Sequence, residues 1–130
     1  MLCVERLRLQ LRYESETWKR LLTFMLDENV HLKFRLSDVL QNNFDKQLLE
    51  ELENFQGRFL KQDELISVLR NDLAGLDKLM VRSVIEDGKI MKEIGIKMKK
   101  IRNHINNAER QFSRLKSEFI IYLSENIQVT

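Results

Sequence analysis

The sequence predicts an all-α protein, an elongated antiparallel three-helix bundle with coiled-coil-like packing. The 130 residues contain no proline and only four glycines, the two residue types that most weaken a helix interior. In three long segments, apolar residues recur at alternating steps of three and four, the spacing of a helix face buried lengthwise against other helices. The length suits a single domain spanning residues 1–130.

The first helix is expected over about residues 3–41. Asp27, Glu28 and Asn29 belong to residue types that include good helix caps, so a kink or split near Asp27–Asn29, giving four helices, is the alternative to the continuous helix that we expect. The apolar stripe, with Asn29 as its polar exception, consists of Trp18, Leu22, Met25, Asn29, Leu32, Leu36 and Val39.

The second and third helices are expected over about residues 44–85 and 89–124. The segments Asn42–Asp45 and Glu86–Lys89 contain residues typical of turns. The stripe of the second helix has one polar member and consists of Leu48, Leu52, Phe55, Phe59, Gln62, Ile66, Leu69, Leu73, Leu76 and Met80. That of the third consists of Ile94, Met98, Ile101, Ile105, Ala108, Phe112, Leu115, Phe119 and Tyr122.

The connection between these two helices has two interpretations. A hairpin at Asp87–Gly88 would place Met80 beside Ile94, and short connections between long amphipathic helices favour it. Because the seven-residue repeat continues through the turn, one unbroken helix in an extended dimer is the alternative.

Asn29 and Gln62 fall at seam positions. A buried polar residue there can set the register or the oligomeric state of packed helices. We prefer the interpretation that each lies at a solvent-accessible edge of a broad interface.

Charge is distributed unevenly along the chain. Residues 44–86 carry six basic and nine acidic groups, whereas residues 89–123 carry nine basic and three acidic groups. The favoured interpretation is that the basic third helix lies beside the acidic second one and that their flanking charges set the pairing. The alternative is a polyanion-binding stripe for nucleic acid or an anionic membrane surface. That stripe consists of Lys89, Lys92, Lys97, Lys99, Lys100 and Arg102.

The first helix is apolar on more than one face. Leu21, Phe24 and Phe34 lie outside its main stripe. We favour a broad buried face, because a helix in a three-helix bundle has two neighbours. Should these residues be exposed, they are candidates for self-association or for binding a partner helix.

The residues that support catalysis or metal binding are few. The sequence has two histidines and one cysteine, and Glu28-x-x-His31 occurs once, whereas a di-iron bundle needs two such motifs. The four glycines are scattered, so no phosphate-binding loop is recognisable. We therefore expect no enzyme activity, cofactor, metal or small-molecule substrate.

The expected location is the cytoplasm. Cys3 is the one cysteine, so no disulfide forms within the chain, and charged residues from Glu5 onward argue against a signal peptide. The predicted function is a non-enzymatic structural or protein-interaction module, with polyanion binding through the third helix as the alternative. The expected partner is another protein or a second copy in a homodimer.

Overall fold

The computed structural model describes residues 2–43, 45–83 and 88–127, with side chains for residues 5–43, 45–83 and 89–127. These residues form three long helices: α1 (Leu2–Asn42), α2 (Lys46–Arg82) and α3 (Gly88–Asn126). The predicted all-α three-helix bundle is confirmed. α1 is continuous through Asp27–Asn29, so the four-helix alternative is wrong.

The helix boundaries follow from local caps. α2 begins two residues later than predicted because the Asp45 carboxylate accepts hydrogen bonds from the backbone N–H groups of Gln47 and Leu48, at 2.9 and 3.1 Å. Asp45 therefore acts as the N-cap, outside the helix. At the other end α2 stops at Arg82 and Ser83 forms its C-cap. Of the second predicted turn, Glu86 and Asp87 lie outside the described residues, and Gly88 is the first residue of α3.

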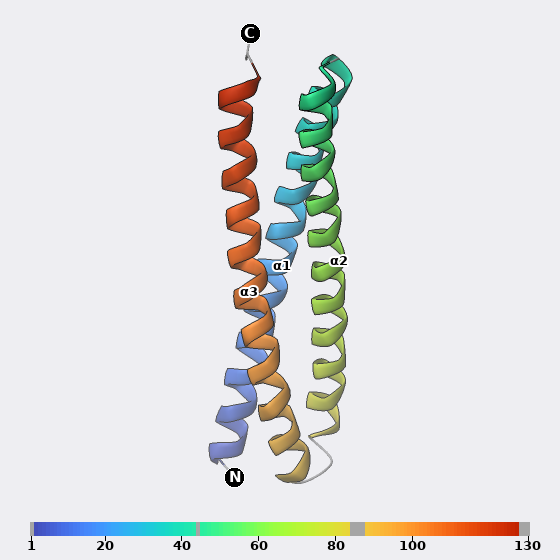
Figure 1. Cartoon of the computed structure of the whole chain (residues 1–130). Coiled ribbons are helices and arrows are strands. Elements are labelled where there is room, and N and C mark those ends of the chain that lie inside the picture. Colours follow the sequence, from blue (N-terminus) through green and yellow to red (C-terminus); the bar gives the residue numbers. More distant parts are fainter. Residues whose placement is uncertain (1, 44, 84–87, 128–130) are drawn as a thin grey trace.

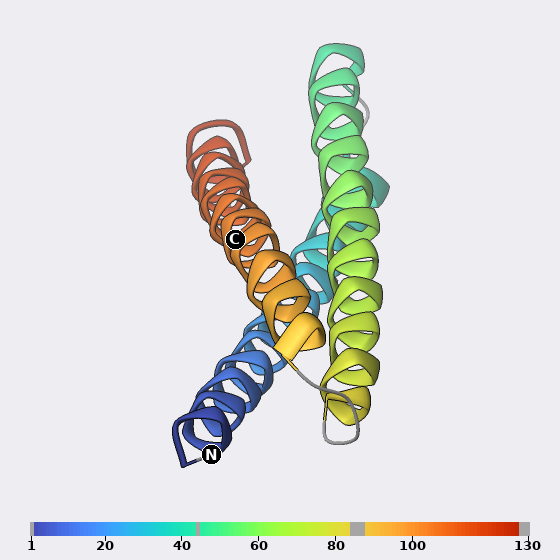
Figure 2. The same ribbon diagram turned by 90° about the horizontal axis from the view of Figure 1, so that it is seen from below.

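The three helices run up, down and up, with the two termini at opposite ends of the bundle (Figure 1). α2 is therefore antiparallel to both α1 and α3. α2 packs closely along both of the other helices, whereas α1 and α3 approach each other more sparsely. Viewed from below, the helices cross at an angle and separate toward their ends (Figure 2). Because α2 and α3 are separate helices lying side by side, the unbroken-helix alternative is wrong.

The core runs the length of the bundle and is built from the three predicted stripes. Leu22 and Leu52 are fully buried, as are Phe59, Ile94 and Phe119. Near one end, Phe55 lies tilted against Phe119 with ring centroids 5.3 Å apart, and Phe59 meets Phe119 edge-on at 5.1 Å. Such tilted aromatic pairs stabilise the packing beyond the area that they bury.

Asn29 and Gln62 lie inside the bundle, so the preferred interpretation of them as edge residues was wrong. Asn29 is 0% exposed and Gln62 is 5% exposed. The Asn29 amide donates to the backbone carbonyl of Phe59 at 3.1 Å and to the carboxylate of Asp63 at 2.6 Å, which joins α1 to α2. The Gln62 amide donates to the carbonyl of Ala108 at 3.2 Å, which joins α2 to α3. Periodicity alone cannot distinguish a buried polar residue from an edge residue.

Among the described residues, no helix combines the length and the apolar character needed to cross a membrane.

Candidate interaction surfaces

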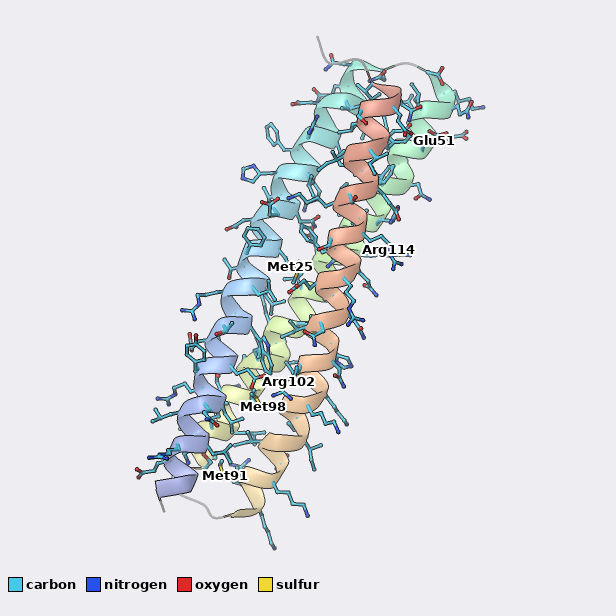
Figure 3. All side chains as sticks on the ribbon, turned by 90° about the vertical axis from the view of Figure 1, so that its left-hand side faces the viewer. Met25, Glu51, Met91, Met98, Arg102 and Arg114 are labelled. Carbon is cyan, nitrogen blue, oxygen red and sulfur yellow. The ribbon has the colours of Figure 1, made fainter. Side chains whose placement is uncertain are left out.

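The basic stripe predicted on α3 is divided by the fold. Arg102 lies between α1 and α3 (Figure 3), where its guanidinium makes two hydrogen bonds with the Glu14 carboxylate at 2.7 and 2.9 Å. It also lies over the ring of Trp18, 5.8 Å from the centroid. The hydrogen bonds with Glu14 raise the pKa of Arg102. Arg102 therefore holds α3 to α1 and is not a free member of a polyanion-binding stripe.

The remaining residues of the stripe are exposed but differ in their neighbours. Lys89, Lys92, Lys97, Lys99 and Lys100 all have exposed side chains. Lys97 lies 3.8 Å from Glu93 on the same helix. In the part of the chain that the structure describes, no ion pair involves Lys92, Lys99 or Lys100.

Two further arginines extend this charge along α3. Arg110 and Arg114 are exposed, and neither makes an ion pair with a described residue. Arg114 lies on the side of α3 that is turned away from α1 (Figure 3). The prediction omitted both because it was restricted to the dense run at residues 89–102. We call Lys92, Lys99, Lys100, Arg110 and Arg114 the basic face of α3.

The charges between helices follow a different pattern from the predicted one. On the α1–α2 side, Lys19 pairs with Asp77, and Lys33 pairs with Asp63. The bond with Asp77 raises the pKa of Lys19. The acidic groups of α2 that make these bridges therefore bind α1 rather than α3.

Helix α3 likewise uses its basic groups toward α1. Lys116 pairs with Glu28 at 2.9 Å, alongside the Arg102–Glu14 pair. Between α2 and α3, Arg58 pairs with Glu118 at 2.6 Å. In this pair the basic residue lies on α2, the helix with net negative charge, and the acidic residue lies on the basic helix α3. The third helix does lie beside the second, but these pairs give no support to the idea that their opposite net charges set the pairing.

The outward side of α1 carries large apolar side chains. Phe34 is 72% exposed and Phe24 is 56% exposed, so the favoured interpretation of a broad buried face was wrong for these two residues. Leu21, the third predicted member, is half-buried and packs against the core. The structure thus separates Leu21 from Phe24 and Phe34.

One aromatic residue of this surface was missed by the sequence reasoning. Tyr13 is 71% exposed on α1. A signal for it was present in the sequence, where Tyr13, Arg20, Asp27 and Phe34 follow one another at intervals of seven residues. Arg20, Asp27 and His31 are also exposed. We call Tyr13, Arg20, Phe24, Asp27, His31 and Phe34 the outer face of α1.

The Glu28-x-x-His31 motif is not assembled into a metal site. Glu28 is engaged by Lys116, while His31 points to solvent on the outer face of α1. Among the described residues, no group of three or more histidine, cysteine, aspartate or glutamate side chains is placed to hold a metal ion. The side chain of Cys3 lies outside the described residues.

Two hollows occur at the ends of the bundle. One, of about 280 Å³, lies where α1 starts and α2 ends, and its lining includes Leu9, Met80 and Met91 as well as Arg8, which donates to the Ser83 carbonyl. The other lies beside Tyr122 and Glu51 at the opposite end. Burial, together with the neighbouring Glu51 carboxylate, raises the pKa of Tyr122.

Comparison with known proteins gives no family for this chain: no family model, curated protein or solved structure matches it.

Proposed function

We propose that the chain is a non-enzymatic helical module of the cytoplasm that binds a protein partner, either a different protein or a second copy of itself, through the outer face of α1. The observation that carries the proposal is the exposure of three aromatic rings, Tyr13, Phe24 and Phe34, on the side of α1 that faces away from the core. Aromatic side chains are enriched at protein interfaces and often contribute most of the binding energy there.

The spacing of the outer face supports a helical partner. Tyr13, Arg20, Asp27 and Phe34 repeat every seven residues, so they form one line along α1. Such a line fits lengthwise against another helix in coiled-coil-like packing. The opposite side of α1 is already occupied, because Trp18, Leu22 and Met25 are buried against the other two helices.

Photo-crosslinking in cells of the native source tests this proposal. Benzoylphenylalanine is introduced into the full chain at Phe24 or at Phe34, and Val68 is the control because it is an exposed apolar residue on α2. We expect discrete crosslinked species at Phe24 and Phe34 that are absent at Val68. Equal or no crosslinking at all three positions would contradict the proposal.

A second candidate function is polyanion binding by the basic face of α3. It is favoured by one observation: five exposed basic side chains on this helix make no ion pair with the described residues. Charges that are not neutralised within a protein attract phosphate groups and release their counterions on binding.

Fluorescence anisotropy with labelled DNA and RNA, and co-sedimentation with phosphatidylserine vesicles, test this candidate at two salt concentrations. For duplex DNA, the variant Lys92→Gln/Lys99→Gln/Lys100→Gln should reduce the steepness of the slope of log affinity against log salt concentration by about 3. The control, Lys46→Gln/Lys61→Gln/Lys78→Gln, removes the same charge from exposed positions on α2. Absence of binding at low salt would eliminate the candidate.

A further inference from the structure

The charges on the outer face of α1 are arranged symmetrically. Arg20 and Asp27 lie equally far from the midpoint between Thr23 and Phe24, at about 5 Å along the helix axis. Tyr13 and Phe34 are also equidistant from that midpoint, at about 16 Å. Along this line of the face, an arginine and an aspartate therefore lie between two aromatic residues, in the order Tyr13, Arg20, Asp27 and Phe34.

This arrangement is complementary to itself in only one orientation. When two copies of α1 lie antiparallel about a two-fold axis at that midpoint, Arg20 of each copy faces Asp27 of the other. Tyr13 then faces Phe34, also twice, because a symmetric interface repeats every contact. In a parallel pair each residue would face its own copy, which would place like charges together at positions 20 and 27.

The groups needed for these contacts are free within one chain. Arg20 and Asp27 are exposed, and neither makes an ion pair with a described residue. Glu16 and His31 are also equidistant from the midpoint, so the antiparallel pair brings the Glu16 carboxylate, which Lys19 of the same chain already contacts at 3.2 Å, near an imidazole of the other copy. Phe24 lies next to the axis, where it approaches its own copy.

We infer that the partner of the outer face of α1 is a second copy of this chain, bound antiparallel with Phe24 at the two-fold axis. This inference rests on the proposed function, since it names the protein that the face binds. The axis lies away from the core, so the three-helix bundle of each copy stays intact in the dimer.

Disulfide trapping tests the antiparallel orientation in the full chain carrying Cys3→Ser. Phe24→Cys should link to itself and give a covalent dimer of twice the 15.6 kDa chain. Tyr13→Cys and Phe34→Cys should each link poorly alone but readily when mixed, which is detected by giving one of them a larger tag. Val68→Cys, exposed on α2, is the control. Strong self-linking of Tyr13→Cys and of Phe34→Cys would indicate a parallel pair and overturn the inference.

Charge reversal tests the pairing of Arg20 with Asp27. By sedimentation equilibrium, Arg20→Asp should weaken dimerisation about tenfold, because it places like charges together twice. Arg20→Asp/Asp27→Arg should restore the dissociation constant to within about threefold, because the swapped pair is again complementary. Arg70→Asp, which reverses an exposed arginine on α2, should leave it unchanged.

The failure of this inference is distinguishable from that of the proposed function. A protein that stays monomeric at all concentrations, yet crosslinks through Phe24 and Phe34 to a different protein in the cell, would overturn the inference and keep the proposed function. A monomeric protein with no crosslinks at these positions would overturn both.

Discussion

The side-chain amide of Asn29 on α1 donates a hydrogen bond to the carboxylate of Asp63 on α2, with 2.6 Å between nitrogen and oxygen. The other oxygen of the same carboxylate accepts a bond from Lys33. Asn29 also donates to the carbonyl of Phe59. These bonds fix how α1 and α2 are aligned, because sliding either helix by one turn would break all three.

Replacing Asn29 by alanine should therefore destabilise the bundle. The change removes a fully buried amide and takes one of two donors from the half-buried Asp63 carboxylate, so we expect the free energy of unfolding to fall by about 1–3 kcal/mol. Urea denaturation followed by circular dichroism measures this. Asn103→Ala, at an exposed position of α3, makes the same exchange and gains the same helix propensity without losing a buried bond. Equal stability of the two variants would show that the Asn29–Asp63 bond contributes little.

Two phenylalanines separate core packing from surface exposure. Phe59 is fully buried against Phe119, so Phe59→Ala should lower the free energy of unfolding by about 3–5 kcal/mol through lost burial and a new cavity. Phe34→Ala removes the same ring from a position that is 72% exposed. At protein concentrations low enough to keep the chain monomeric, it should change the free energy of unfolding by no more than about 0.5 kcal/mol. Denaturation of the two variants side by side checks this. A large loss for Phe34→Ala in the monomer would mean that its ring contributes to the fold.

Two exposed helical glycines offer a route to higher stability. A methyl group added at Gly75 of α2 or Gly95 of α3 would meet no atom within 4 Å. Alanine lowers the backbone entropy of the unfolded chain, so each change should raise the free energy of unfolding by roughly 0.5–1 kcal/mol. The two sites lie on different helices, and their effects should add. Thermal denaturation of the single and double variants measures these changes. A decrease in stability at either site would mean that the added methyl group meets an atom that does not belong to the single chain.

The stability of the protein should fall at high pH, in part through Tyr122. Its pKa is raised in the folded state above the ordinary value of about 10, so the folded protein holds this proton when the unfolded chain has released it. The contribution of Tyr122 to the free energy of unfolding is therefore fully present below pH ~10 and is lost as the pH rises above ~10.

The side chain of Tyr122→Phe has no proton to lose. When the pH is raised from ~8 to ~11, the free energy of unfolding of this variant should therefore fall by up to about 1 kcal/mol less than that of the parent protein. Urea titrations at the two pH values give the comparison. Tyr13→Phe is the control, because it removes a hydroxyl from an exposed ring. Parallel losses in all three proteins would mean that Tyr122 does not govern the alkaline transition.

Much of the architecture was predictable because it rests on local physics. The spacing of Leu52, Phe59 and Ile66 places them on one helix face whatever their neighbours are, and all three are buried. The start of α2 was predicted two residues too early, although Asp45 caps it through hydrogen bonds that reach only two and three residues along the chain. The continuity of α1 follows in the same way, because its stripe keeps its spacing through Asn29.

The candidate surfaces were less predictable because they depend on which helix faces which. Arg102 belongs to a run of basic residues in the sequence, yet it binds Glu14, 88 positions away. Phe24 and Phe34 are apolar residues that the sequence allows to be buried, and only the position of α2 and α3 leaves them in solvent.

The sequence by itself determined the three helices and the main apolar stripe that each directs inward, because periodicity and capping act within one helix. Only the tertiary structure decided the partners: that Asn29 and Gln62 donate across the interior, and that α1 shares ion pairs with both neighbours. It also decided that α1 keeps an aromatic face open. The physical reason is that burial of a side chain, and the pairing of a charge, depend on residues that are distant in the chain and are brought close only by packing.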